Sequence, residues 1–169
     1  MHHTAMKRNG SKLDSAPEGN EIRELKLSDF DDGFLATLGN LSSTDELSPE
    51  EGRKILKRLG RTSPYHVLVA VTGGQVVGAT TLLVEQKFIH NGGLVGHIED
   101  VTVRKGYEGR GLGGSLVTAA VRLAEELGCY KVILDCKEGL VGFYEGLGFR
   151  KHDVGMRRDL KQGPVRIRS

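Results

Sequence analysis

The spacing of hydrophobic and polar residues in the first part of the chain predicts one strand followed by two helices. Residues 21–27 carry apolar side chains at roughly every second place, which is typical of a strand. Residues 30–41 carry them at helical spacing, with Ser28 and Asp29 available as N-caps. Residues 48–60 open with Ser-Pro-Glu-Glu, a capping box with proline at the first helical position, and therefore predict a second helix.

The middle of the chain has the pattern of an antiparallel meander. Tyr65–Val71 and Gln75–Val84 are strand-like runs, and Gly73-Gly74 between them is a two-residue hairpin signal. A second hairpin signal, Asn91-Gly92-Gly93, precedes a strand over Leu94–Val103. Three consecutive strands are therefore expected here.

The last third of the chain predicts two further helices and two further strands. A glycine-rich segment at 105–114 leads into an amphipathic helix over Ser115–Leu127. Lys131–Cys136 has the composition of a buried strand, Val141–Leu147 of a short helix and Val154–Leu160 of a last strand. The order β-α-α-β-β-β-α-β-α-β predicts an α/β fold with a mixed central sheet and helices on both faces.

Composition and charge are those of one ordinary globular domain. The chain has 169 residues, of which 38% are hydrophobic and 27% charged, so one core is affordable. We expect a disordered polar tail at 1–20, the domain at 21–160 and a basic tail at 161–169. The net charge of +2, with both signs intermixed, calls for neither a nucleic acid nor a membrane as partner.

Two cysteines, Cys129 and Cys136, are too few for a disulfide scaffold, and their spacing matches no common zinc motif. We expect reduced thiols, a cytoplasmic location and no metal. The sequence contains neither an apolar run of membrane-spanning length nor a signal-peptide core.

The glycines at 109–114 are the strongest chemical signal. A glycine-rich loop before a helix lets several backbone N–H groups converge on an anion. Gly109, Gly111 and Gly114 also fit the dinucleotide pattern, with Asp135 about 20 residues further on. However, the five residues from 104 to 108 separate this loop from its strand, and a helical pair and a meander precede it. A connector without any ligand is a third interpretation.

The segment Glu108–Gly113 resembles the loop Gln/Arg-x-x-Gly-x-Gly/Ala with which the GNAT superfamily of acetyltransferases holds the pyrophosphate of coenzyme A. Glu108 departs from that pattern. Four longer blocks resemble the glucosamine-6-phosphate N-acetyltransferases within the superfamily: Lys87–His90, Gly96–Val101, Gly128–Cys136 and Gly142–Tyr144. Leu140 stands where this family often has asparagine. The resemblance extends from Ile22 to Leu160.

The resemblance implies a GNAT fold and transfer of acetyl from acetyl-CoA to the amine of D-glucosamine 6-phosphate, within UDP-N-acetylglucosamine synthesis. It implies that main chain at Val101, Thr102 and Val103 meets the pantetheine arm, with the Val101 N–H polarising the thioester carbonyl. The residues implied to hold the pyrophosphate are Gly109, Arg110, Gly111, Leu112, Gly113 and Gly114. Tyr144 would donate its hydroxyl toward the departing thiolate.

For the acceptor, the resemblance implies that Glu99, Asp100 and Asp135 surround the sugar and its amine. It implies a homodimer in which Lys87, Phe88, Ile89 and His90 approach the phosphosugar, partly across the interface. Ser42 would lie near the phosphate, and Arg157 or Arg158 in the last strand would contact it.

Each of these residues also has a purely structural interpretation. Of the neighbours Glu99 and Asp100, one could be merely solvated, and Asp135 could be a helix N-cap. Tyr144 could be a core aromatic residue and His97 a structural histidine. Two other functions also stay open: a GNAT enzyme for another amine, such as a polyamine or peptide N-terminus, and a non-catalytic acyl-CoA-binding module.

Overall fold

The computed structural model describes residues 16–42, 47–62 and 64–160. The chain divides into two compact units, Met1–Leu134 and Asp135–Ser169. Most of the expected N-terminal tail and the whole basic tail at 161–169 lie outside the described residues.

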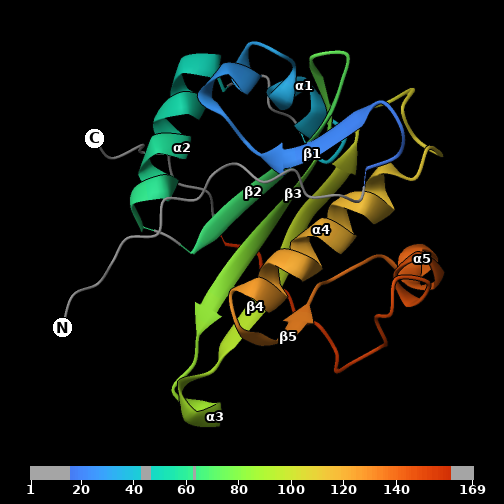
Figure 1. Ribbon diagram of the computed structural model, residues 1–169. Coiled ribbons are helices and arrows are strands. Elements are labelled where there is room, and N and C mark those ends of the chain that lie inside the picture. The colour runs from blue at the N-terminus through green and yellow to red at the C-terminus, as the bar shows by residue number, and fades with distance from the viewer. Residues whose placement is uncertain (1–15, 43–46, 63, 161–169) are drawn as a thin grey trace. The chain divides into compact units, whose positions relative to one another are not determined.

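The first unit is built on a five-stranded mixed sheet in the order β1-β2-β3-β4-β5. Its strands are antiparallel from β1 to β4, whereas β4 and β5 are parallel (Figure 1). The bounds are Asn20–Glu24 for β1, Tyr65–Thr72 for β2, Gln75–Gln86 for β3, Leu94–Val103 for β4 and Cys129–Ile133 for β5.

The helices of the first unit are η1 (Leu27–Phe30), α1 (Phe34–Leu38), α2 (Pro49–Thr62), α3 (Ile89–Gly92) and α4 (Leu112–Glu126). In α2 the predicted capping box is present, because the Glu51 carboxylate accepts the Ser48 N–H at 2.9 Å and the Glu51 N–H donates to the Ser48 hydroxyl at 3.3 Å. The second unit holds η2 (Glu138–Leu140) and α5 (Val141–Glu145). The predicted α/β class with a mixed sheet is confirmed.

Two predicted elements do not form as single regular elements, and the predicted strand Lys131–Cys136 is observed as Cys129–Ile133. The first predicted helix is broken into η1 and α1 by Gly33, whose φ of 94° is incompatible with a continuous right-handed helix. The predicted last strand, Val154–Leu160, is wrong: these residues are exposed and form neither a strand nor a helix. A strand needs a neighbour to complete its backbone hydrogen bonds, and no described strand pairs with this segment.

One face of the sheet packs against α4, which Figure 1 shows lying across the front of the strands. Two glycines make this close approach possible. A Cβ on Gly78 would lie 2.9 Å from the Leu116 side chain, and one on Gly96 would lie 3.3 Å from the Ala124 side chain. The buried residues of α4 that cover this face are Leu112, Leu116, Val117, Ala119, Ala120, Leu123 and Ala124.

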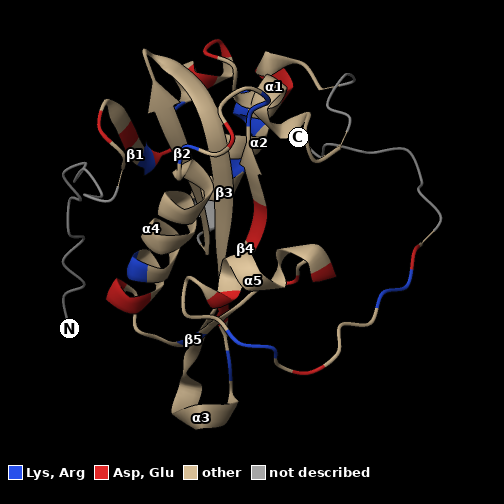
Figure 2. Cartoon of the chain, turned by 90° about the vertical axis from the view of Figure 1, so that its right-hand side faces the viewer, with Lys and Arg blue, Asp and Glu red and all other residues tan. Residues whose placement is uncertain are grey.

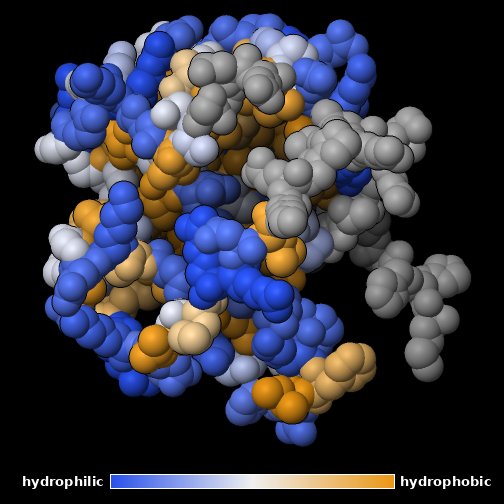
Figure 3. Space-filling model, turned by 180° about the vertical axis from the view of Figure 1, so that it is seen from behind, coloured by the Kyte–Doolittle hydropathy of each residue, from blue (hydrophilic) through white to orange (hydrophobic). Residues whose placement is uncertain are grey.

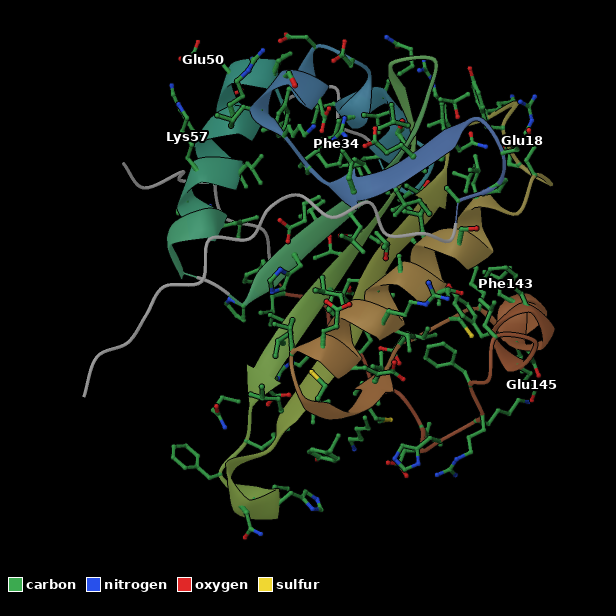
Figure 4. The ribbon with its side chains drawn as sticks, viewed as in Figure 1. Glu18, Phe34, Glu50, Lys57, Phe143 and Glu145 are labelled. Atoms are coloured by element: carbon green, nitrogen blue, oxygen red, sulfur yellow. The ribbon has the colours of Figure 1, made fainter. Side chains whose placement is uncertain are left out.

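The opposite face carries a second apolar cluster beneath η1, α1 and α2. Its buried members are Phe30, Phe34, Val69, Val71, Val76 and Ala79. Phe34 points from α1 into this layer, whereas Glu50 and Lys57 project from α2 away from the sheet (Figure 4). Helices therefore cover both faces, as the sequence predicts.

A buried ion pair joins β1 to η1. Both terminal guanidinium nitrogens of Arg23, Nη1 and Nη2, donate to the Asp29 carboxylate, at 2.7 and 2.8 Å, and the Lys26 N–H donates to it at 2.6 Å. The Asp29 residue is only 1% exposed. Burial alone would raise the pKa of this carboxyl, but the hydrogen bonds from Arg23 and Lys26 outweigh it and leave the pKa below its usual range. The Asp29 carboxylate thus binds Arg23 and the Lys26 N–H, and Asp29 is not itself the N-cap of η1.

Asp29→Asn is expected to lower the free energy of unfolding at pH 7 by about 3–5 kcal/mol, because the largely buried Arg23 guanidinium then keeps only the more distant Glu21 carboxylate, at 3.7 Å. A lowered folded-state pKa means that the contribution is present above the unfolded pKa of about 3.9 and is lost as the pH falls through the folded value. Urea unfolding of parent and variant should therefore differ most near neutrality and converge in acid. The control is Asp31→Asn, whose carboxylate pairs with Arg53 at 2.5 Å on the surface and should cost at most about 1 kcal/mol. Equal losses in the two variants would contradict this.

Candidate active site

A β-bulge interrupts the pairing of β3 with β4. Ala79 pairs with Thr102, whereas Thr81 pairs with Glu99, so β4 contains one residue more than β3 over this stretch. Asp100 within the bulge has a φ of 54°, in the left-handed region that side chains rarely adopt. Glu99 and Asp100 are both exposed, so the simple alternation expected of a strand does not hold here (Figure 2, where Asp and Glu are red).

Strand β4 continues through the bulge after its pairing with β5 has ended. Their pairing covers Leu94–His97 of β4 and ends there. The backbone of Ile98–Val103 on the side toward β5 is consequently not part of a ladder between these two strands. The Asn40 side-chain amide donates to the Val103 carbonyl at 2.6 Å. An extended ligand with amide groups can bind such a strand edge as an added strand would.

The glycine-rich segment ends in the first turn of α4. The helix begins at Leu112, one turn before the predicted start at Ser115, and its N-cap Gly111 has a φ of 77°. Because the first helical hydrogen bond runs from the Ser115 N–H to the Gly111 carbonyl at 3.0 Å, the N–H groups of Leu112, Gly113 and Gly114 lack helical partners. These three N–H groups lie at the positive end of a 15-residue helix, an arrangement that is suited to binding an anion.

Side chains of the preceding loop contact the loop itself. The Glu108 carboxylate accepts the Gly106 N–H at 2.5 Å, and hydrogen bonds from its own backbone N–H and that of Gly106 keep its pKa below the usual range. Arg110 donates to the Gly106 carbonyl at 3.1 Å and lies over the Tyr107 ring, 5.0 Å from its centre. Gly109 has a φ of 73°. The departure at Glu108 therefore has a structural use of its own.

The predicted phosphosugar segment lies at the tip of the β3–β4 hairpin. Lys87 is half-buried and donates to the Glu85 carboxylate at 2.5 Å. His97 contacts the other oxygen of Glu85 at 2.8 Å, which agrees with its interpretation as a structural histidine. These two hydrogen bonds lower the pKa of the Glu85 carboxyl, and the bond from Lys87 has the larger effect.

Phe88 and Ile89 at this tip are exposed, the former completely. Figure 3 shows hydrophobic surface at the bottom of the view, the end of the molecule at which Figure 1 labels α3. His90 has a φ of 52° and its ring lies 4.7 Å from that of Tyr130. The hairpin tip thus presents apolar side chains to solvent beside a histidine that contacts the Tyr130 ring at a tilt of 45°.

In the second unit, Tyr144 packs edge-on against Phe143 and Phe149, with ring centres 4.9 and 6.0 Å apart. Figure 4 shows Phe143 and Glu145 on the same short helix, α5. Burial, and then the nearby Cys136, raise the pKa of the Tyr144 hydroxyl. The phenol is therefore protonated at neutral pH and able to donate.

Asp135 is exposed at the start of the second unit. Its interpretation as a helix N-cap is wrong, because the N-cap of η2 is Lys137 and that of α5 is Leu140. A Cβ on Gly155 would lie 3.4 Å from an Asp135 carboxylate oxygen, so the chain passes close to this carboxylate there.

The two candidate arginines differ in their surroundings. Arg157 forms an ion pair with Asp159 at 2.6 Å, whereas the guanidinium of Arg158 has no such partner among the described residues. Both are exposed on a segment that is not a strand, so the expected alternation does not separate them. Ser42, in the first unit, is exposed just beyond α1.

Over the described ranges, no three His, Cys, Asp or Glu side chains gather as metal ligands would. In the same ranges no helix is both long and apolar enough to span a bilayer.

A model of the Acetyltransferase (GNAT) family matches residues 22–149. The chain belongs to this family. The match includes the bulge in β4, the edge between β4 and β5, the N-terminus of α4 and the short helix α5. The alternative of a dinucleotide-binding loop, which rested on the glycine spacing and on the position of Asp135, does not describe this fold.

Relatives within the family carry more specific names. A glucosamine 6-phosphate N-acetyltransferase of Candida albicans is 43% identical over 142 residues, which are 83% of this chain and 95% of the relative. One of Trypanosoma brucei brucei is 41% identical over 141 residues, again 83% of this chain and 95% of the relative. The crystal structure of glucosamine-6-phosphate N-acetyltransferase from Arabidopsis thaliana superimposes with a TM-score of 0.82 at 31% identity, over 85% of this chain and 100% of that one.

Three polar residues near the site were not singled out from the sequence: Asn40, Thr80 and Glu85. Thr80 had a usable signal, since it and Thr81 interrupt an otherwise apolar strand. Asn40 and Glu85 gave none, because polar residues at the end of a helix or strand are ordinary.

Proposed function

We propose that this chain transfers acetyl from acetyl-CoA to the amine of D-glucosamine 6-phosphate, giving N-acetyl-D-glucosamine 6-phosphate and CoA. Residues 21–160 would form the acetyltransferase domain, serving UDP-N-acetylglucosamine synthesis. A cytoplasmic location is in keeping with the free thiols of Cys129 and Cys136. The observation that carries the proposal is that β4 continues past the end of its pairing with β5 and is followed along the chain by the N-terminus of α4, whose first N–H groups have no helical partner.

This geometry offers hydrogen-bonding groups to two parts of coenzyme A, the pyrophosphate and the pantetheine arm. The N–H groups of Leu112–Gly114 suit the pyrophosphate, because they are donors at a positive helix end. The backbone of Val101–Val103 offers amide groups to the amide-containing pantetheine arm. Acetyl-CoA would supply the activated acetyl group, and no metal is needed.

The reaction needs an uncharged amine, a polarised carbonyl and a stabilised leaving thiolate. The Val101 N–H would polarise the carbonyl, an effect typically of a few kcal/mol. Glu99, Asp100 and Asp135 would surround the acceptor and take the proton that the ammonium loses. The amine nitrogen then bonds to the carbonyl carbon while the carbon–sulfur bond breaks. The nitrogen gives up its second proton as the sulfur gains one, so that a neutral amide and the thiol of CoA result. Tyr144, whose raised pKa keeps it protonated, would donate to the sulfur.

The choice of acceptor is supported by the names of the relatives and by the hairpin tip. Lys87 and His90 bring two basic side chains to the tip, and the relatives at 43% and 41% identity are named for glucosamine 6-phosphate. A thiol-release assay should compare glucosamine 6-phosphate, glucosamine, a polyamine and a peptide at equal concentration. Much faster release of CoA with the phosphosugar than with the other three amines supports the proposal. Preference for the polyamine or peptide would indicate another GNAT enzyme, and no release at all a non-catalytic acyl-CoA-binding module.

Arg158→Ala is expected to raise the Michaelis constant for glucosamine 6-phosphate by about tenfold, as the loss of one charge-assisted hydrogen bond would. Arg157→Ala should have a smaller effect, because Asp159 already neutralises that guanidinium. Neither change should affect the slow reaction of unphosphorylated glucosamine. Steady-state kinetics with both acceptors provides the check, and a larger effect at Arg157 would reverse the assignment.

We also propose a homodimer in which Lys87–His90 contribute to a shared site. Phe88 and Ile89 support this, since two exposed apolar side chains at a hairpin tip are suited to burial against a second copy. Light scattering at micromolar concentration should give twice the chain mass, and Phe88→Glu should shift the population toward monomer. A monomer mass for the parent protein would contradict the proposal.

A further inference from the structure

Thr80 in β3 lies directly opposite the bulge in β4. It falls between Ala79 and Thr81, the residues that pair with Thr102 and Glu99. Its side chain is fully buried, and its hydroxyl donates to the Glu99 carbonyl at 3.1 Å. Thr80 is thus a buried polar residue with a defined partner on the bulge itself.

The orientation of the Glu99 carbonyl bears directly on the backbone conformation of Asp100. The Glu99 carbonyl and the Asp100 N–H belong to one planar peptide group. A hydrogen bond to that carbonyl therefore fixes the plane from which the φ rotation of Asp100 begins. This matters because Asp100 has a φ of 54°, which an aspartate adopts only when its surroundings impose it.

The next peptide group carries the Val101 N–H. Its direction follows from the plane before it and from the two backbone angles of Asp100. If the Glu99 peptide were free to turn, Asp100 could relax toward ordinary extended angles and the Val101 N–H would point elsewhere. The structure therefore links a buried hydroxyl in β3 to the direction of one backbone donor in β4.

We propose that Thr80 is a positioning residue for acetyl transfer: through the Glu99 carbonyl it holds the bulge in the conformation that aims the Val101 N–H at the thioester carbonyl. This inference rests on the proposed function. It assigns Thr80 no contact with either substrate. The effect should appear in turnover rather than in binding, since the oxyanion develops only in the transition state.

The test compares Thr80→Val, which keeps the shape and removes the hydroxyl, with Thr80→Ser, which keeps the hydroxyl. Thr80→Val should lower kcat by about 10- to 100-fold, less than the about 100- to 1,000-fold expected when an oxyanion donor is removed outright. Its KM for acetyl-CoA should stay within about twofold of the parent value, because ground-state binding does not use this donor. Thr80→Ser should recover most of the lost turnover.

Thr37→Val is the matched control for stability. Thr37 is equally buried, and its hydroxyl donates to the Val76 carbonyl at 2.8 Å, outside the bulge. It should lower the melting temperature as Thr80→Val does, yet keep the parent kcat. Should Thr80→Val fail to fold, Thr80→Cys, with a weak donor of similar size, takes its place in the comparison with Thr80→Ser.

The outcomes separate this inference from the proposed function. A parent protein that releases no CoA with any amine overturns the proposed function. An active parent with a folded Thr80→Val variant of unchanged kcat overturns the positioning role alone. A fall in kcat that Thr37→Val reproduces, or that Thr80→Ser does not relieve, also overturns it, because the loss would then reflect general destabilisation.

Discussion

Gly111→Val is expected to abolish detectable binding of acetyl-CoA while the protein stays folded. Gly111 is the N-cap of α4, with a φ of 77° that valine strongly disfavours. A side chain there would also stand beside the N–H groups of Leu112–Gly114. Losing two hydrogen bonds to a charged phosphate, at about 1.5–3 kcal/mol each, would weaken binding by about 100-fold or more.

The space around Gly111 indicates that folding would survive. The nearest heavy atom to a Cβ at this position is Cγ of Pro17 at 3.9 Å, so nothing in the core has to move. Backbone strain should reduce stability by about 1–2 kcal/mol.

Gly128→Val is the matched control, because Gly128 follows the other end of the same helix with a φ of 84° and has no heavy atom within 4 Å of a Cβ. Both variants should lose similar stability by thermal unfolding, but only Gly111→Val should lose affinity in titration calorimetry. Unchanged affinity in a folded Gly111→Val variant would show that the helix end does not hold the pyrophosphate.

Asp135→Asn is expected to lower turnover by about 100-fold or more, the usual contribution of a positioned acid or base. The change keeps the shape and removes the negative charge that would orient or deprotonate the ammonium. Its deficit should shrink as the pH rises, because a larger fraction of the acceptor is then already uncharged. The KM for acetyl-CoA should change little.

Tyr144→Phe should also reduce turnover, with a different pH profile. The raised pKa of Tyr144 keeps the parent hydroxyl protonated throughout the neutral range, so the variant's deficit should persist as the pH rises. A pH series of kcat on both variants distinguishes the two roles. Asp153→Asn and Tyr65→Phe, on exposed residues outside the candidate site, should match the parent enzyme.

If Asp135→Asn and Tyr144→Phe both turn over at the parent rate, these catalytic assignments are wrong, although the family membership is unaffected. A Tyr144→Phe deficit that disappears at high pH would instead place this hydroxyl on the acceptor's proton path.

Much of the fold follows from local pattern. The bounds of β4, Leu94–Val103, agree with the run of residues that predicts them, and the capping box at Ser48 opens α2 as expected. Alternation, caps and paired glycines act over a few residues, so they can be interpreted without knowing what lies nearby in space. The glycine segment likewise predicts an anion site, because it needs only a loop and the helix after it.

The long motifs determined the family, and the structural comparison agrees with them. They identify Glu99, Asp135 and Tyr144 as candidate catalytic residues, but they do not show how these residues are arranged in space. The true start of α4 at Leu112 illustrates this: Gly113 and Gly114 are poor helix formers, yet they form the first turn because Leu112 and Leu116 are buried against the sheet.

Only the tertiary structure decided where the bulge lies, where the pairing of β4 with β5 ends, and that Val154–Leu160 forms no strand. Each depends on pairing between strands that are distant in the sequence, and a run of alternating residues does not specify its partner or register. The segment 154–160 alternates well enough to predict a strand, but no described strand pairs with it. The hydroxyl of Thr80 acquires its partner for the same reason, since Glu99 is 19 residues away and reaches it only through the register that the bulge imposes.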